Sequence, residues 1–213
     1  MTAPVISAYF AMEKTGEKHM TDNVLTAPGT PVQQSKWLTS YYFTRAAVSA
    51  FWVAAAWAVH PDMSVVVGAL LLVYPAWDAA ANVVDAKRNG GFRRNPTQAL
   101  NAVVSVATTA AVAIALGMSM NAVLGVFGVW AALSGVFQLA TGVRRWRGLG
   151  AQWPMILSGA QSAFAGVMFL QAAAAPEVPQ IAAIAPYAAF GAFYFLVSAI
   201  WLTVADRRHR AAR

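Results

Sequence analysis

Six long apolar stretches, separated by short polar segments, run along the chain and predict six transmembrane helices. They cover residues 37–59, 64–86, 97–117, 121–142, 154–174 and 181–204. Each stretch has about twenty residues, and a helix of that length crosses the ~30 Å hydrocarbon core of a bilayer. The pattern therefore predicts an all-α membrane protein with a six-helix transmembrane domain over residues 37–206.

Polar segments flank this domain at both ends. Residues 1–36 are polar, with Pro, Gly, Thr and Gln, which predicts a flexible tail. Residues 207–213 form a short basic tail. Met20 opens a segment typical of a bacterial start, so either Met1 or Met20 is the first residue of the expressed protein.

The composition supports the membrane assignment. Hydrophobic residues make up 59% of the chain and charged residues only 11%, whereas a soluble domain has about a quarter charged residues. There is no cysteine. This excludes disulfides, thiol catalysis and cysteine-based metal sites.

The basic residues predict the orientation of the helices. Fourteen of the 15 Lys and Arg residues lie in the tails and in the loops after spans 2 and 4, while the loops HPDM, GMSM and APEVPQ have none. By the positive-inside rule both termini are cytoplasmic. The net charge of +7 is therefore an orientation signal, and no nucleic-acid partner is expected. The exception is Arg45, inside the first span.

The sequence also contains a repeat. Three segments align on Ser49, Ser105 and Ser162, at spacings of 56 and 57 residues, and each second helix closes with basic residues. This predicts three helical hairpins of equal orientation, related by parallel repetition. The hairpins cover residues 37–86, 97–142 and 154–204.

Two segments carry a resemblance to a known family. They are "YPAWDAAANVVDAKR" from residue 74 and "RGLGAQWPMILSGAQSAFAGVMF" from residue 147, the latter with Arg147, Gly148 and Trp153 in its loop. Together with the three-hairpin plan they resemble the HdeD-like family, six-helix bacterial inner-membrane proteins described as acid-resistance membrane proteins and built from a short repeat of unknown function. The resemblance implies an inner-membrane location, no established enzyme activity and an association with acid stress. The long polar N-terminal tail departs from the family's pattern.

Opposite charges lie at matched depth in the first hairpin. Arg45 is about eight residues into span 1 and Asp78 about eight residues from the end of span 2, so both lie roughly 12 Å deep. Charged residues at that depth usually face inward and pair, so we predict an Arg45–Asp78 ion pair. Tyr74, Asn82 and Asp85 share the helix side of Asp78 and are predicted to give it polar support. We favour a structural role for the pair, with a proton or ion relay as the alternative.

Two further residues of span 2 add to this prediction. Asp85 is close enough to the surface to meet Lys87 or water. Pro75 removes one backbone hydrogen bond and predicts a kink just before Asp78. We favour accommodation of packing as its role over a hinge in a gated path.

Milder polar stripes follow other predicted helices. They comprise Asn101, Ser105, Thr108 and Thr109 in span 3, Ser134, Gln138 and Thr141 in span 4, and Ser158, Gln161 and Ser162 in span 5. Interhelical hydrogen bonds worth about 0.6 to 2 kcal/mol each are the favoured explanation, and a hydrated path is the alternative. Small residues at four-residue spacing predict close helix contact at Gly128 and Ala132, Ala131 and Gly135, and Ala188 and Ala192.

The histidines lie outside the spans. His19, His60 and His209 lack the spacing of metal ligands, so no metal site is predicted. His60 lies beside Asp62 in an outer loop, where a histidine gains a proton as the external pH falls through about 6 to 7. We favour an incidental loop histidine over an external pH sensor.

No phosphate-binding loop, nucleophile motif or acid pair in an aqueous cleft is found, so an enzyme or a cofactor is not expected. The leading hypothesis is a non-enzymatic inner-membrane protein acting in envelope or acid-stress adaptation. The alternative is a channel or transporter for protons or a small solute that uses Arg45, Asp78 and the polar stripes. The expected partner is the lipid bilayer, and self-association or contact with other membrane proteins is the further hypothesis. A transporter needs a water-filled cavity past Asp78, whereas a structural bundle should be closed there.

Overall fold

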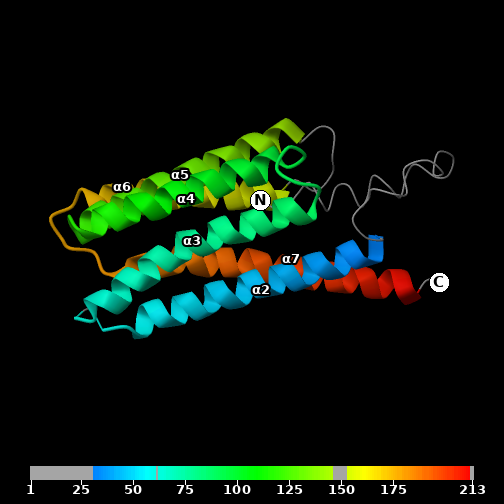
Figure 1. The fold of residues 1–213 in the computed structure, drawn as a ribbon, viewed down its shortest axis with the longest axis horizontal. Coiled ribbons are helices and arrows are strands. Elements are labelled where there is room, and N and C mark those ends of the chain that lie inside the picture. Colours follow the sequence, from blue (N-terminus) through cyan, green and yellow to red (C-terminus); the bar gives the residue numbers. More distant parts are fainter. Residues whose placement is uncertain (1–30, 61, 146–152, 212–213) are drawn as a thin grey trace.

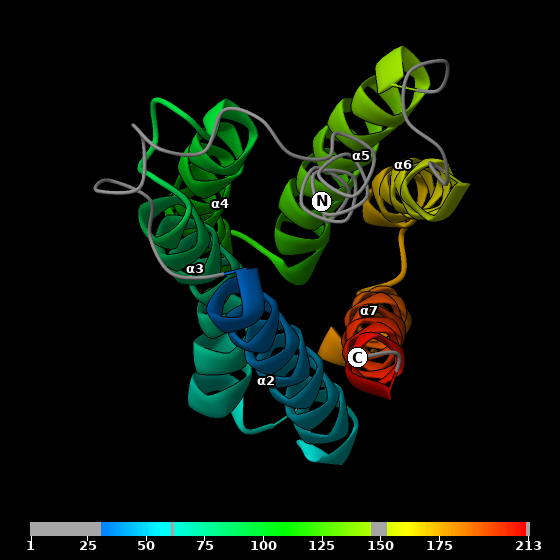
Figure 2. The same cartoon turned by 90° about the vertical axis from the view of Figure 1, so that its right-hand side faces the viewer.

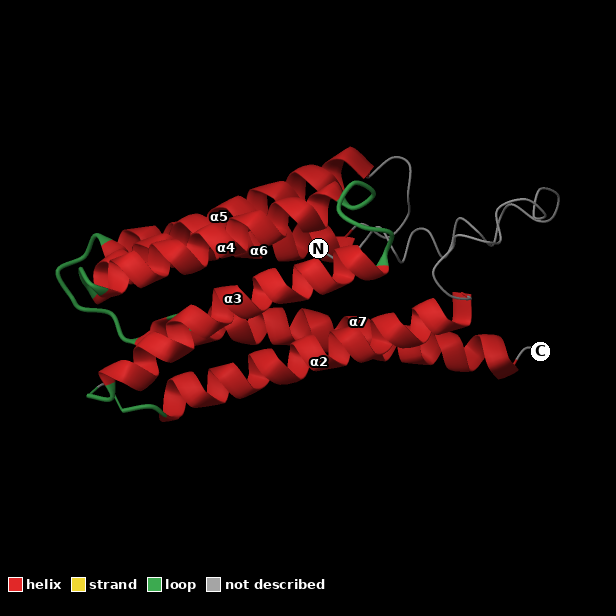
Figure 3. Cartoon of the chain, in the orientation of Figure 1, coloured by secondary structure: helices red, strands yellow, loops and turns green. Residues whose placement is uncertain are grey.

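The structure is a computed structural model that describes residues 31–60, 62–145 and 153–211, and this part of the chain is helical (Figures 1 and 3). The helices are α2 (Pro31–Ala58), α3 (Ser64–Arg88), α4 (Pro96–Leu116), α5 (Met120–Arg145), α6 (Trp153–Ala173) and α7 (Ala185–Ala211). A 3-10 turn, η1 (Ile181–Ala183), precedes α7. No strand occurs in the described ranges, in agreement with the predicted all-α class. Most of the predicted N-terminal tail and most of the loop before α6 lie outside the described residues.

Each predicted span corresponds to one helix, and the differences lie at the two ends of the domain. Helix α2 begins at Pro31 rather than at residue 37, so it includes the last residues assigned to the N-terminal tail. Helix α7 begins after η1 and continues to Ala211, into the predicted basic tail. Lys, Arg, Gln and Ala are good helix formers, so neither end has a residue that stops the helix at the edge of the apolar stretch.

Five of the helices in the described residues are long and apolar enough to cross a membrane. These segments are Ser64–Arg88, Pro96–Leu116, Met120–Ala140, Ile156–Ala173 and Ala185–Arg208. Helix α2, the first of the six predicted spans, is not among them. Its sequence carries Arg45 together with several Tyr, Ser and Thr residues, which lower its mean hydropathy. Most of these polar groups are turned inward, since Arg45 and Ser49 are buried.

Viewed along the bundle, the helices form a ring in chain order (Figure 2). The extensive contacts are those of α3 with α4, α5 with α6, and α7 with α2, the last of which closes the ring. Helices joined within a predicted hairpin contact each other less, and α2 with α3 and α6 with α7 hardly touch. The start of α2 and the end of α7 lie at the same end of the bundle (Figure 1). The hairpins therefore splay apart, and each packs against its neighbours in the ring.

Helices α5 and α6 approach each other backbone to backbone. A Cβ added to Gly135 would lie 2.3 Å from the amide nitrogen of Ala163, and one added to Gly166 would lie 2.5 Å from that of Ala132. Such distances leave no room for any side chain, so only glycine fits at these positions. The small residues predicted at Gly128, Ala132 and Gly135 thus lie in a close helix contact, as small-residue interfaces in membranes do.

Candidate functional site

A buried ion pair joins α2 to α3 near the middle of the bundle. The Arg45 guanidinium contacts the Asp78 carboxylate, and the two side chains are 9% and 17% exposed. A second guanidinium nitrogen of Arg45 donates to the Tyr41 hydroxyl at 3.2 Å, and Tyr41 donates to the carbonyl of Ala81 at 3.1 Å. The Phe195 ring lies 4.2 Å from the guanidinium carbon, a cation–π distance. The long arginine side chain spans the wide gap between the two splayed helices.

The second carboxylate oxygen of Asp78 is also satisfied. It accepts hydrogen bonds from the Ser105 hydroxyl of α4 at 2.7 Å and from the Asn82 amide at 3.0 Å. Asn82 donates to the backbone carbonyl of Asp78 as well, at 2.8 Å. Asp78 therefore holds α2, α3 and α4 together at one point. Asn82 lies where the helix periodicity predicted it, whereas the bond from Ser105 was not predicted.

Asp85 does not belong to this cluster. It is 8% exposed and accepts hydrogen bonds from the side chains of Gln98 at 3.2 Å and Asn89 at 2.7 Å. Asp85 was predicted to meet Lys87 or water and to support Asp78, whereas the side chains that bond it in the structure are Gln98 and Asn89. The reason is the turn after α3, which brings the start of α4 back against the end of α3 and places Gln98 beside the carboxylate.

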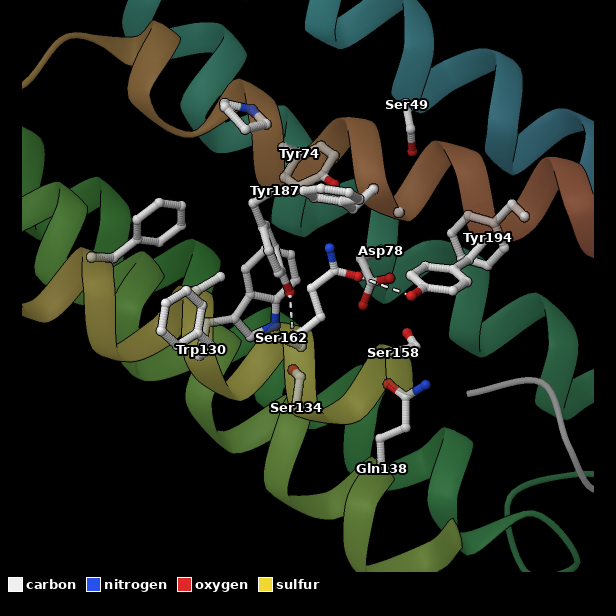
Figure 4. A pocket seen from close by; sticks show the side chains of 18 of the residues that line it. Ser49, Tyr74, Asp78, Trp130, Ser134, Gln138, Ser158, Ser162, Tyr187 and Tyr194 are labelled. Atoms are coloured by element: carbon white, nitrogen blue, oxygen red, sulfur yellow. Dashed lines mark hydrogen bonds between the residues drawn. The ribbon is translucent and has the colours of Figure 1, made fainter. Parts of the chain in front are cut away.

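Tyr74 has a different role from the predicted polar support of the ion pair. Its ring packs on Trp52 at 4.6 Å between centroids and on Trp130 at 5.8 Å, and Trp130 in turn contacts Tyr187 at 6.3 Å. Tyr74, Trp130 and Tyr187, here named the central aromatic triad, come from α3, α5 and α7. They meet in the interior of the ring, at one end of a cavity (Figure 4).

The spacing of the predicted repeat contains a signal for this triad. Tyr74, Trp130 and Tyr187 each follow the aligned serine of their own repeat by 25 residues. The position 29 residues after each serine is occupied by Asp78, Ser134 and Gly191. Equivalent positions therefore face the same interior space, with an acid in the first repeat and no side chain in the third.

The cavity has a volume of about 600 Å³ and lies between the ion pair and helices α5, α6 and α7. Its polar lining comprises Arg45, Ser49, Tyr74, Asp78, Ser134, Gln138, Ser158, Gln161, Ser162, Tyr187, Tyr194 and Ser198. The apolar lining includes Trp77, Trp130, Phe164, Met168, Phe190 and Phe195. Figure 4 shows Tyr74, Trp130 and Tyr187 toward one end and Gln138, Ser158 and Tyr194 toward the other. Of the polar residues predicted in spans 4 and 5, Ser134, Gln138, Ser158, Gln161 and Ser162 share this space.

Two hydrogen bonds between these polar groups connect α7 to α6. The Tyr194 hydroxyl donates to the Gln161 side-chain oxygen at 2.9 Å. The hydroxyls of Ser162 and Tyr187 are hydrogen-bonded at 3.1 Å, and Ser162 also lies 3.1 Å from the carbonyl of Ala131. These side-chain bonds cross a gap that the helix backbones leave open.

The stripe predicted on span 3 faces its neighbours rather than the cavity. Asn101, Ser105 and Thr108 are buried, and none of them lines the space. Thr108 and Thr109 donate to carbonyls of their own helix, each at 2.8 Å. The predicted interhelical hydrogen bonding therefore fits Ser105, which donates to Asp78 of α3, whereas Thr108 and Thr109 bond within α4.

His60 lies in the loop after α2, far along the chain from the ion pair and outside the cavity lining. One ring nitrogen lies 3.2 Å from the Asp62 carboxylate, and the side chains are 72% and 90% exposed. The structure therefore places the histidine beside the predicted acid, in solvent. Among the described residues, no group of three or more His, Asp or Glu side chains could hold a metal ion.

One family model matches part of the chain. The family described as a short repeat of unknown function (DUF308) matches residues 100–171, which include most of α4, all of α5 and most of α6. A search of curated proteins and a search of solved structures found no match. The match fits a membrane protein of the short-repeat type, and with the five apolar helices it indicates an integral, multi-pass membrane protein. The Arg45–Asp78 pair lies outside the matched residues.

Proposed function

We propose that this chain is a non-enzymatic, HdeD-like protein of the bacterial inner membrane that binds a small molecule in its central cavity. The observation that carries the proposal is the cavity of about 600 Å³ beside the Arg45–Asp78 pair. Binding sites for small molecules have volumes of about 300 to 1,000 Å³, mostly apolar walls and a few convergent polar groups. This cavity has a volume in that range and several aromatic wall residues, and its polar lining is richer than that of a usual site.

The splayed packing supports the same proposal. A bundle whose only task is to hold its helices together would fill its centre with side chains, because empty space forfeits dispersion contacts. Here the third repeat has Gly191 where the first has Asp78, and a Cβ added to Gly191 would have Tyr74 as its nearest neighbour, at 3.8 Å. A larger side chain would therefore fit at this position, and the space is left open instead.

The cellular role that we propose is envelope or acid-stress adaptation, which the resemblance to the HdeD-like family implies. The end of the bundle that carries Lys36, Lys87, Arg88 and Arg207 is proposed to be cytoplasmic, by the positive-inside rule. In the cysteine-free chain, Ser119→Cys should react with an impermeant thiol reagent added outside whole cells, and Arg93→Cys should not. Reversed labelling would overturn this orientation.

The link between the cavity and the cellular role is tested by filling the cavity. In a strain that lacks the chain, survival after acid challenge should be restored by the wild-type chain but not by Gly191→Leu. The matched control is Val197→Leu, on the same helix at a position 44% exposed and outside the cavity lining. Full restoration by Gly191→Leu, at equal protein levels, would overturn the proposed use of the cavity.

Transport of protons or of a small solute is the second candidate function. It is favoured by the position of Pro75, which lies in α3 between the aromatic triad residue Tyr74 and the cavity-lining Asp78. A proline inside a helix removes a backbone hydrogen bond, so α3 can bend where the cavity is closed. Purified protein in liposomes should then pass protons or small solutes, and Gly191→Leu should stop the flux. Flux equal to that of empty liposomes would exclude transport.

A further inference from the structure

We infer that the ligand of the central cavity is a neutral, membrane-dissolved amphiphile, and that it enters from the bilayer between α6 and α7. The inference rests on the proposed binding function and adds the chemical class of the ligand and its route. Three features of the described residues carry it: the side mouth of the cavity, the closure of its other boundaries, and the charge of its lining.

The mouth lies on the side of the bundle. Phe164 and Met168 of α6 and Phe190 of α7 line the cavity, yet they are 66%, 47% and 49% exposed. A residue that lines the cavity and is also exposed on the outside of the bundle lies at an opening. These three residues flank the gap between α6 and α7, the neighbouring helices that contact each other least. Both helices belong to segments apolar enough to span a membrane, so in a bilayer this opening faces hydrocarbon.

Three other boundaries of the cavity are closed. The central aromatic triad and Phe169, which lies 5.9 Å from Tyr187, occupy the end nearer the loops after α2 and α4. The contact of Gly135 with Ala163 seals α5 against α6. On the far wall, the bond from Ser105 to Asp78 ties α4 to α3. The gap between α6 and α7, which the Tyr194–Gln161 and Ser162–Tyr187 hydrogen bonds cross, is the approach at which lining residues are exposed.

The lining selects a neutral head group. Arg45 and Asp78 are its charged residues, and they neutralise each other by direct contact. A charged ligand would have to lose its hydration without gaining an unpaired partner, which is costly in low dielectric. Amide and hydroxyl groups at Gln138, Ser158 and Tyr194 offer hydrogen bonds to a neutral polar head.

The remaining lining suits an apolar tail. Phe164, Met168 and Phe190 lie at the mouth, so a tail would leave the cavity through them and continue into the hydrocarbon. The head would then lie on the side of Gln138 and Ser158, toward the end of the cavity opposite the aromatic triad (Figure 4). This arrangement keeps the hydrogen-bonding head out of lipid and the tail within it.

Photolabelling of the protein in lipid nanodiscs tests the inference. The probes are a diacylglycerol, which is neutral, and a phosphatidylglycerol, which is anionic, each with the diazirine on its acyl chain, and a water-soluble diazirine. The readout is label on Trp130, which lines the cavity but is only 6% exposed and so is shielded from lipid around the bundle. We expect the diacylglycerol probe to label Trp130 in the wild-type chain. Label should fall about tenfold in Gly191→Leu, the change that 1.4 kcal/mol of binding free energy produces, and should persist in Val197→Leu.

The outcomes separate this inference from the proposed function. Labelling of Trp130 by the water-soluble probe alone would show a ligand from the aqueous phase; it would overturn the inference and leave the binding function standing. Labelling of Trp130 by the anionic lipid as strong as that by the diacylglycerol would overturn the inference that the ligand is neutral. Chain-to-chain crosslinks between the faces of α6 and α7 would show that a second copy covers the mouth, which also overturns it. No label on Trp130 from any probe would overturn both proposals.

Discussion

Helix α6 has two faces that the protein uses in opposite ways. Toward α5 it presents Gly159, Ala163 and Gly166, and the two backbones touch. Toward α7 it presents Gln161, Phe164 and Met168, and the backbones stay apart around a cavity. Both faces belong to the same apolar segment, so hydropathy alone does not distinguish them.

The difference shows how a helix in a membrane is either joined to a neighbour or kept away from it. Lipid chains are as apolar as leucine, so association depends on close van der Waals packing and hydrogen bonds rather than on hydrophobicity. Small residues allow such packing along the α5–α6 contact. Bulky aromatic and polar residues prevent it between α6 and α7, where side-chain bonds such as that of Tyr194 with Gln161 bridge the gap. The matched repeat, residues 100–171, covers the tight contact.

The largest expected effect on stability is at the Arg45–Asp78 ion pair, which joins the loosely packed helices α2 and α3. Arg45→Met or Asp78→Leu alone should lower the free energy of unfolding by roughly 3 to 5 kcal/mol, because each leaves an unpaired buried charge. Replacing both, Arg45→Met with Asp78→Leu, should recover much of the loss, since the two ions no longer have to be buried. The measurement is thermal unfolding of the purified variants in detergent.

A double-mutant cycle on these variants decides between the two roles of the pair. Recovery of stability together with recovery of acid survival would indicate a structural pair. A stable but inactive double variant would indicate a relay. Purely additive losses from the single changes would mean that Arg45 and Asp78 do not interact, and the pairing would be wrong.

The next largest effect on stability is expected at the close contact between α5 and α6. Gly135→Ala puts a Cβ where the backbone of Ala163 already lies at 2.3 Å, so α5 and α6 must separate. Overpacking of this kind costs about 1 to 3 kcal/mol, which should appear as a lower melting temperature. Gly125→Ala on the same helix is the matched control, because its Cβ would meet the Ala173 side chain at an ordinary 3.7 Å. Equal behaviour of both variants would contradict the backbone contact.

A smaller loss is expected where α4 reaches the ion pair. Ser105→Ala removes the 2.7 Å hydrogen bond to Asp78 and should cost about 1 kcal/mol, in the range measured for interhelical bonds in membranes. Thr109→Val is its control, because the Thr109 hydroxyl bonds only to a carbonyl of its own helix, at 2.8 Å. Chemical unfolding of the two variants side by side gives the comparison. If Ser105→Ala is as stable as the wild type, the Ser105 hydrogen bond does not stabilise the protein, and Asp78 is held by Arg45 and Asn82.

The smallest structural effect should come from His60, outside both faces. His60→Gln changes a side chain 72% exposed and should leave the melting temperature unchanged. If the histidine is the external pH sensor, the variant should lose the pH dependence of the acid response between about pH 5 and 7. The acid survival of cells carrying the variant is the readout. An unaltered response would mean that His60 is an incidental loop residue.

Local properties of the sequence determined the helices and the depth of their charges. The mean hydropathy of windows of about twenty residues predicted the helices, because this quantity depends only on residues close together in the sequence. The regular rise of a helix placed Arg45 and Asp78 at one height, and the structure has them in contact. Helix periodicity likewise put Asn82 beside Asp78. Small residues at four-residue spacing marked the contact at Gly135 without naming the partner helix.

Only the tertiary structure decided which helices meet and where space remains. Hairpin connectivity suggested that α2 and α3 pack together, but α2 packs mainly on α7, from the other end of the chain. The partners of Asp85 and the bond from Ser105 follow from how α4 lies against α3. The cavity depends on α3, α5, α6 and α7 meeting at once, with Asp78 and Gly191 both in its lining. Such features arise from faces of distant helices brought together, and no local pattern of residues encodes the distance between two backbones.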